Sequence, residues 1–286
     1  INRLIAMDEQ IKLGRRPEDI AKEFRIKKTT LEQDLWVYGV IREAIKRSET
    51  GSGATLRQID FEDHQEKLRE LYRAYTTTAA IDKDAAETLK ETRLAMIVLG
   101  FSKTDLRLAQ PDFYQKYLTP KLPPELSART TPSGTIKVPG LGVSVPGNTP
   151  EAEAAKSLTN RLLQAKATIQ SGIRSVTAED RSAADAIHSE IKESFNRALD
   201  PAGKDARLQK RKLAAPERLS DACDNIELCV GDLAQARATN AIDDAAFDDA
   251  ANRLKTSIQK LAREARRTFS DPGDGISWLL TIAEVD

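Results

Sequence analysis

The chain has 286 residues, which is long enough for two domains, and its 44 basic and 44 acidic residues cancel. A uniformly basic or acidic binding surface is therefore excluded, and any charged patch must be local. No apolar run approaches the roughly 20 residues that a membrane-spanning helix needs. Many residues are Ala, Leu, Glu, Lys or Arg and only 5% are aromatic, which favours an all-α fold.

The N-terminal part of the chain predicts three helices. The first covers Asn2–Leu13, and Gly14 fits its C-terminal cap. The next two form a helix-turn-helix between Arg16 and Tyr38. Its apolar residues have the spacing that a compact two-helix unit needs: Ile20, Ala21, Phe24, Ile26, Leu31 and Leu35.

Local signals support both helices of this unit. Pro17 suits the first position of a helix, and Glu18 and Asp19 fall in the first turn, where the helix dipole favours acidic residues. Thr29 and Thr30 are expected to supply a hydroxyl that caps the second helix. These signals predict two helices joined by a short basic turn.

The unit has an Ile-Ala pair, a bulky apolar residue three positions after Ala21, a turn, and an aliphatic residue followed by Lys or Thr. In this pattern the stretch from Asn2 to Tyr38 resembles the helix-turn-helix of ParB/KorB-type DNA-binding proteins. That family usually has glycine where Arg25 stands, because the turn needs a positive φ. The resemblance implies double-stranded DNA as the partner and plasmid partition or transcription regulation as the role. It does not extend to CTP binding, because the nucleotide-binding motif is missing.

Positive charge is concentrated beside this unit. Between Lys12 and Lys28 the sequence has seven Lys or Arg and three Asp or Glu, which suits phosphate contacts, although a solvated helix face is the alternative interpretation. Gln33 can read an adenine edge with two hydrogen bonds, and Glu32 can accept one from a cytosine amino group. The expected DNA-binding residues are Arg15, Arg16, Lys27, Lys28, Thr29, Thr30 and Gln33.

Helical patterns continue as far as residue 118. The second helix of the helix-turn-helix is expected to run past Gly39 to Lys46, and Ser48–Ala54 to form a flexible break. Further helices are predicted over Asp60–Ala80, Asp82–Leu99, Ser102–Ala109 and Pro111–Leu118. Residues 1–118 are therefore predicted to form one helical domain.

Residues 119–150 differ sharply from the rest of the chain. They contain seven of the twelve prolines and four of the fourteen glycines, which excludes a long helix and predicts an extended interdomain linker. Within them, Ile136–Val145 alternates apolar residues. This segment is either a stiff part of the linker or a strand-like piece that docks on a domain or a partner.

Residues 151–286 are predicted to be a helical bundle. Short turns, one of them at Asp200–Gly203, join the long amphipathic segments, a pattern typical of bundles. The expected helices are Ala152–Gln170, Thr177–Leu199, Pro216–Ala238 and Asp243–Phe269. The apolar tail around Trp278 should dock on something apolar. We expect this domain to form a homodimer or to bind a protein partner.

The sequence offers no constellation for catalysis. His64 and His188 are the only histidines and are expected on the surface of different domains, while Cys223 and Cys229 lack a nearby histidine for a zinc site. Phosphate loops, dinucleotide fingerprints and nucleophile elbows are absent. We therefore predict no enzyme activity, no cofactor and no metal site.

Two further basic runs, Lys204–Lys212 and Arg253–Arg267, suit the helix dipole, with an auxiliary nucleic-acid patch as the alternative.

The leading interpretation is a cytoplasmic, nucleoid-associated DNA-binding protein that acts as a dimer, because a two-fold pair of recognition helices doubles the DNA site. One rival is a helical interaction or structural protein whose helix-turn-helix is only a fold element. Another is the DNA-specificity subunit of a larger nuclease or defence complex. The chain begins at Ile1 rather than methionine, which is consistent with a fragment or a processed form that lacks an upstream functional segment.

Overall fold

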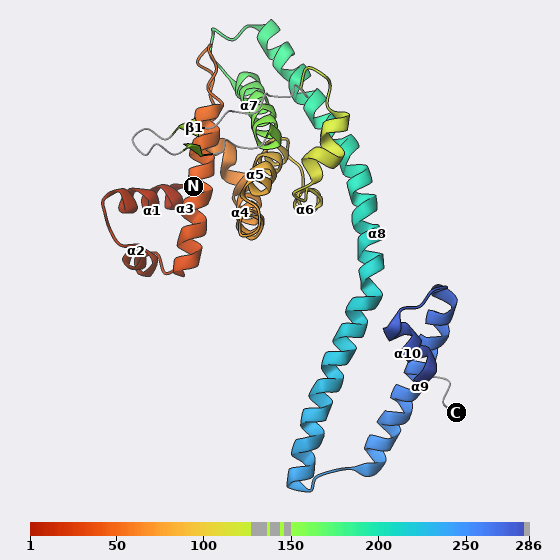
Figure 1. Ribbon diagram of the computed structural model, residues 1–286. Coiled ribbons are helices and arrows are strands. Elements are labelled where there is room, and N and C mark those ends of the chain that lie inside the picture. The colour runs from red at the N-terminus through yellow and green to blue at the C-terminus, as the bar shows by residue number, and fades with distance from the viewer. Residues whose placement is uncertain (127–135, 138–143, 146–149, 283–286) are drawn as a thin grey trace. The chain divides into compact units, whose positions relative to one another are not determined.

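The computed structural model describes residues 1–126, 136–137, 144–145 and 150–282. It confirms the all-α prediction: nearly all of the regular structure is helical (Figure 1). The chain divides into two compact units, unit 1 over Ile1–Lys210 and unit 2 over Arg211–Asp286. Within the described part of the chain, no helix is both long enough and apolar enough to cross a membrane.

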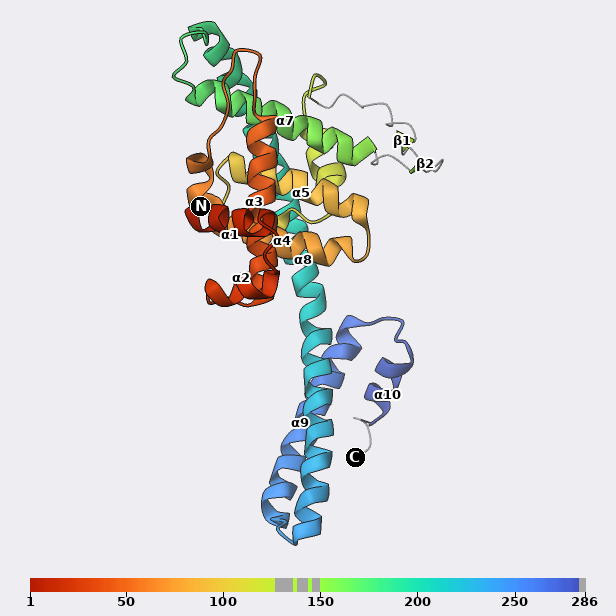
Figure 2. The same ribbon diagram turned by 90° about the vertical axis from the view of Figure 1, so that its left-hand side faces the viewer.

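The first three helices form a small three-helix unit. They are α1 (Asn2–Lys12), α2 (Pro17–Glu23) and α3 (Lys28–Arg47), and each contacts the other two (Figures 1 and 2). Their shared core consists of Met7, Ile20, Ala21 and Leu31, with Ile11, Phe24, Ile26 and Leu35 packed around it. The predicted helix-turn-helix apolar positions thus meet in one cluster.

The cap predicted for α3 is wrong. The helix begins two or three residues earlier than expected, so Thr29 and Thr30 lie inside its first turn. Lys27 occupies the N-cap position, with extended backbone angles, and no side chain accepts a hydrogen bond from the first-turn N–H groups. The Thr30 amide donates to the Lys27 carbonyl at 3.0 Å, and the amides of Lys28 and Thr29 have no side-chain cap.

Behind α3 lies the main core of unit 1. The predicted helix Asp60–Ala80 is split into a 3₁₀-helix, η1 (Gln58–His64), and α4 (Gln65–Ala79). It is followed by α5 (Lys83–Val98), α6 (Lys103–Leu108), the π-helical turn η2 (Tyr114–Leu118) and the short 3₁₀-helix η3 (Thr119–Lys121). After the linker region, α7 (Pro150–Gln170) packs along α5.

A buried ion pair connects three of these helices. The Arg47 guanidinium at the end of α3 donates to both carboxylate oxygens of Glu91 on α5, at 2.9 and 2.6 Å. Its Nε also donates to Oδ1 of Asn160 on α7 at 2.5 Å. Glu91 is only 2% exposed. Burial opposes the charge of Arg47, but the pairing outweighs it, so the Arg47 pKa is raised. The end of α3 is thereby fixed to the core.

The expected linker is only partly described. Residues 119–126 belong to unit 1, where Leu122 is buried and Leu126 packs against the core. Residues 127–135, 138–143 and 146–149 lie outside the described part of the chain, so the linker prediction is not tested there. Two short strands, β1 (Ile136–Lys137) and β2 (Ser144–Val145), pair antiparallel with Ile136 opposite Val145.

The second half of the chain differs from the expected four-helix bundle. A single helix, α8 (Ala178–Thr239), replaces the two predicted helices and the turn at Asp200–Gly203. Pro201 and Pro216 lie inside it, although an interior proline removes one backbone hydrogen bond and crowds the carbonyl four residues earlier, at a cost of about 3 kcal/mol. At Pro201 the burial of Phe195 and Ala198 in the core of unit 1 opposes this cost.

The domain division also differs from the prediction. The structure divides the chain after Lys210, inside α8, rather than at residues 119–150. The physical reason is burial: Leu158 and Leu162 of α7 and Phe195 of α8 belong to the same hydrophobic core as α3, α4 and α5.

Unit 2 contains the end of α8, α9 (Asp244–Thr268) and α10 (Asp274–Ile282). The side chain of Asp243 caps α9 by accepting a hydrogen bond from the Ala246 amide. The apolar tail predicted around Trp278 forms α10 and packs against α9, with Leu279 and Leu280 half-buried. Trp278 itself stays 62% exposed.

Candidate nucleic-acid interface

The turn between α2 and α3 has a strained residue at its centre. Helix α2 ends in two crossed hydrogen bonds: the Ile26 amide donates to the Ala21 carbonyl and the Arg25 amide to the Lys22 carbonyl. This pattern requires a left-handed residue at Arg25, whose φ is +53°. Such a conformation brings Cβ of a non-glycine residue too close to the backbone and costs roughly 1–2 kcal/mol.

Arginine is an unusual choice for this position. Four helices in the described part of the chain end in this manner, and three of them use residues that tolerate a positive φ. Gly14 follows α1, Gly100 follows α5 and Asn240 follows α8. Only α2 is followed by a long cationic side chain. The positive φ that the sequence resemblance required at Arg25 is thus observed, with arginine in place of glycine.

The exposed start of α3 lies directly after this turn. Lys27, Lys28, Thr29 and Glu32 are exposed, Thr30 is half-buried, and Leu31 is in the core. The uncapped N–H groups and the helix dipole give this end a partial positive charge. The surface therefore combines exposed polar side chains with free backbone donors.

Three of the expected DNA-binding cations already have carboxylate partners. Arg15 pairs with Glu23 at 2.6 Å, Arg16 with Asp19 at 3.0 Å, and the Lys28 ammonium with Oε1 of Glu18 at 2.7 Å. The hydrogen bond between Lys28 and Glu18 raises the pKa of Lys28 and lowers that of Glu18. These pairs are exposed, and exposed pairs contribute little to stability, so an incoming anion can replace the carboxylate.

Three other cations remain without a carboxylate partner within the described residues. They are Lys22, Arg25 and Lys27, all exposed and all at the α2–α3 turn. We call these residues the turn cations. Of these three residues, the sequence predicts only Lys27 as a DNA contact. Lys22 and Arg25 are not predicted, because the sequence does not show which positive charges form ion pairs. The sequence feature that could have identified Arg25 is an arginine at the position where the ParB/KorB-type motif, which this stretch resembles, usually has glycine.

Gln33, which is expected to read a base, forms a hydrogen bond within the protein. Its amide nitrogen donates to the Arg69 backbone carbonyl of α4 at 3.0 Å, and the side chain is half-buried. The neighbouring Asp34 carboxylate is 3% exposed and accepts from Arg69 at 2.9 and 3.0 Å. Both side chains therefore hold α3 against α4. The expected base contact of Gln33 would require breaking a hydrogen bond within the protein.

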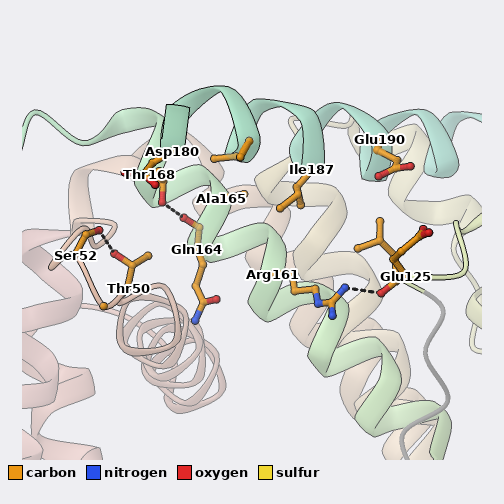
Figure 3. Close-up of a pocket in the computed structure, with 14 residues that line it drawn as sticks. Thr50, Ser52, Glu125, Arg161, Gln164, Ala165, Thr168, Asp180, Ile187 and Glu190 are labelled. Atoms are coloured by element: carbon orange, nitrogen blue, oxygen red, sulfur yellow. Dashed lines mark hydrogen bonds between the residues drawn. The ribbon is translucent and has the colours of Figure 1, made fainter. Parts of the chain in front are cut away.

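A groove in unit 1 offers a different candidate. It is a groove of about 870 Å³ between α7 and the start of α8, closed by the loop at Thr50–Ser52 (Figure 3). Two of its charged side chains are already used in structural contacts. Arg161 donates to the Glu125 carbonyl at 2.6 Å, and the Asp180 carboxylate caps α8 through Thr177. Its described lining contains no histidine, cysteine or lysine.

The remaining sequence candidates do not gather into a site. His64 and His188 both belong to unit 1 and are half-buried, contrary to the expected surface positions in different domains. Burial, together with the positive charge of Lys166, lowers the pKa of both histidines. Cys223 and Cys229 are exposed free thiols. No group of three or more metal-ligating side chains is found in the described residues.

The two additional basic runs lie on exposed helix surface. In the first, Lys204 pairs with Asp200 one turn earlier on α8. In the second, Arg267 pairs with Glu264 on α9. These contacts along a single helix are typical of solvated faces.

Comparison of the chain with protein-family models, with curated proteins and with solved structures found no match.

Proposed function

We propose that this chain binds double-stranded DNA through the α2–α3 helix-turn-helix, as a ParB/KorB-like protein or a transcription regulator. The observation that carries the proposal is the grouping of the turn cations beside the uncapped start of α3. Phosphate contacts from such cations position a protein on the duplex. The α3 start would then enter the major groove, as the second helix of this motif does.

The strain at Arg25 supports the same conclusion. A residue held in a disfavoured backbone conformation is a reason to look for a function at that position. Glycine would satisfy the turn at lower conformational cost in the folded state, but it offers no charge. An exposed guanidinium without a carboxylate partner is well suited to bind a phosphate with two parallel hydrogen bonds.

The expected contacts can be divided by their surroundings. Lys22, Arg25 and Lys27 are available without breaking any ion pair. Lys28 becomes available when a phosphate replaces Glu18. Thr29 is the exposed hydroxyl nearest to these cations in the sequence and is the candidate for a base or phosphate contact. Arg15 and Arg16 take a secondary role because each is paired.

The test is a fluorescence anisotropy titration of labelled duplex DNA at several salt concentrations. Replacing Lys27 and Lys28 together by Ala should weaken binding to selected and random sequences alike. It should also lower the slope of log affinity against log salt by about 1–2, because each lost phosphate contact contributes about 0.9.

The matched control removes two other exposed lysines of unit 1. Lys83 begins α5 and Lys121 ends η3, and neither has an ion-pair partner in the described part of the chain. Replacing both by Ala removes the same charge and should leave DNA affinity and its salt dependence nearly unchanged. Parent protein without salt-dependent DNA binding, or equal losses in both double variants, would contradict the proposed interface.

A further inference from the structure

Unit 2 has helices but almost no core of its own. From residue 211 to 257 nearly every side chain is exposed, on the last part of α8 and on most of α9. Isolated helices are marginal in water, and helices in proteins gain most of their stability by burying an apolar face. These helices therefore have apolar faces that something else must cover.

Both helices carry an apolar stripe with the seven-residue repeat of a coiled coil. The α8 seam is Leu219, Cys223, Ile226, Val230 and Leu233; the α9 seam is Phe247, Ala251, Leu254, Ile258, Leu261 and Ala265. Spacings alternate strictly between four and three, which keeps each seam on one face. The large seam residues on α8 are 37–64% exposed.

The apolar faces of α8 and α9 in unit 2 are wider than the seam of a two-helix coiled coil. The positions that flank the α8 seam are mostly small, namely Ser220, Ala222, Ala234 and Ala236, and Ala250, Ser257 and Ala262 flank the α9 seam. Small flanking residues allow helices to approach on both sides of the seam, as in bundles, where an apolar face extends beyond the two central positions. Each helix is thus suited to more than one helical neighbour.

Some of this surface is covered within the chain. Helix α10 packs on α9, where Ala262 and Ala265 are buried, and Ile282 lies over Leu254 and Ile258. Leu254 and Leu261 nevertheless remain 45% and 40% exposed. The covering by α10 is therefore partial, and the α8 seam remains exposed.

Charge identifies the missing neighbour. Between residues 217 and 232 the α8 segment has five acidic residues and one basic residue. Helix α9 begins with acidic residues, but between residues 253 and 267 it has six basic residues and one acidic residue. Asp221, Asp224 and Glu227 of α8 and Arg253, Lys260 and Arg263 of α9 form no ion pair within the described residues. Each copy therefore carries both halves of a complementary pair, which a two-fold symmetric arrangement can satisfy twice.

We infer that unit 2 pairs with unit 2 of a second copy of this chain, forming a four-helix bundle around the α8 and α9 seams. In this bundle, α8 of one copy lies beside α9 of the other, which buries the apolar stripes and brings acidic and basic surfaces together. The inference does not depend on DNA binding, because it rests only on the residues of unit 2.

The test is sedimentation velocity of the full chain over a wide range of concentrations. A reducing buffer excludes a disulfide between Cys223 or Cys229 of two copies. The parent should be a dimer that dissociates on dilution. Ile226→Lys places a charge in the α8 seam of both copies and should raise the dissociation constant about a hundredfold or more. Circular dichroism should report a loss of helix as the dimer dissociates.

The matched control is Leu228→Lys. Leu228 is 68% exposed and lies two positions after Ile226, on the opposite side of α8 from the seam. Leu228→Lys replaces an aliphatic side chain of the same size by lysine, as Ile226→Lys does, and should leave the dimer intact. Because Ile226 lies outside the core of unit 1, the melting transition of that core should be the same in both variants.

A strictly monomeric parent overturns the inference, and so does an Ile226→Lys variant that dimerises as tightly as the parent. Dissociation by Leu228→Lys but not by Ile226→Lys also overturns it, because the interface would then lie on the other face of α8.

Discussion

The conformation of Arg25 makes a quantitative prediction about the Arg25→Gly variant. At φ +53° a non-glycine residue costs roughly 1–2 kcal/mol relative to its preferred conformation. Glycine removes that cost but loses about 0.5–1 kcal/mol more backbone entropy on folding. The two effects leave a net stabilisation of about 0.5–1 kcal/mol. For a unit of 210 residues, this corresponds to an increase of about 1–4 °C in the melting temperature.

The matched variant is Arg25→Ala. Alanine loses the guanidinium as glycine does, but it keeps the Cβ and therefore the strain at a positive φ. Differential scanning calorimetry should find Arg25→Gly more stable than both the parent and Arg25→Ala. In DNA titrations the two variants should behave alike: both should bind more weakly, and both should lower the salt slope by about 0.9.

Two outcomes would refute this reasoning separately. Equal melting temperatures for the glycine and alanine variants would mean that the turn is not strained at Arg25. Unchanged DNA affinity in both would mean that the guanidinium is not a phosphate contact, and that the strain has another origin.

Two further predictions concern unit 1. Glu91→Ala removes the buried charge partner of Arg47 and leaves only the exposed Glu43, so urea denaturation should find a loss of stability of up to about 3–5 kcal/mol; a loss below about 1 kcal/mol would mean that Glu43 or water compensates the Arg47 charge. The pKa values of His64 and His188 are lowered by burial and by Lys166, so protonation favours the unfolded chain, and stability should fall as pH decreases from 7.5 through about 6.5 to 5.5. Replacing both histidines by Gln should flatten this dependence in urea titrations; an unchanged pH dependence would assign it to other groups.

Helices α2 and α3 and their shared apolar cluster could be predicted from sequence because the signals are local. Pro17, the acidic residues after it and the apolar spacing through Leu31 all act within a few turns of helix. The cap of α3 could not be predicted in the same manner. The hydroxyl groups of Thr29 and Thr30 indicate a cap at one of these residues, whereas Lys27 occupies the N-cap position in the structure. Helix boundaries depend on small energy differences within the first turn.

The compact units of the structure divide the chain after Lys210 rather than at residues 119–150, and the reason is a different one. The sequence pattern identifies the apolar face of α7 but not its partner, which is α5, about seventy residues earlier in the chain. Proline and glycine around residues 119–150 indicated a break in secondary structure, and such a break need not separate two cores. Similarly, Pro201 suggested a turn, whereas burial of Phe195 and Ala198 holds the surrounding helix in the core.

The prediction of DNA-contacting residues was limited because a count of charges does not show which of them form ion pairs. Seven cations between Lys12 and Lys28 are visible in the sequence, but their partners are not. Lys12, Arg15, Arg16 and Lys28 are paired with carboxylates, so the remaining charge is concentrated at Lys22, Arg25 and Lys27. Gln33 illustrates the converse, since a residue suited to read a base is used instead to hold α4.

The two proposals have a common physical basis, although separate experiments test them. A single recognition helix contacts only a few base pairs, and in α3 Leu31 and Asp34 lie on the face toward the protein. A second copy would supply another half-site and so lengthen the DNA sequence that is read. Unit 2 has the complementary problem, because its helices have apolar seams and lack a core. Pairing of two copies would satisfy both requirements: it would bury the α8 and α9 seams and give one DNA molecule two sets of turn cations.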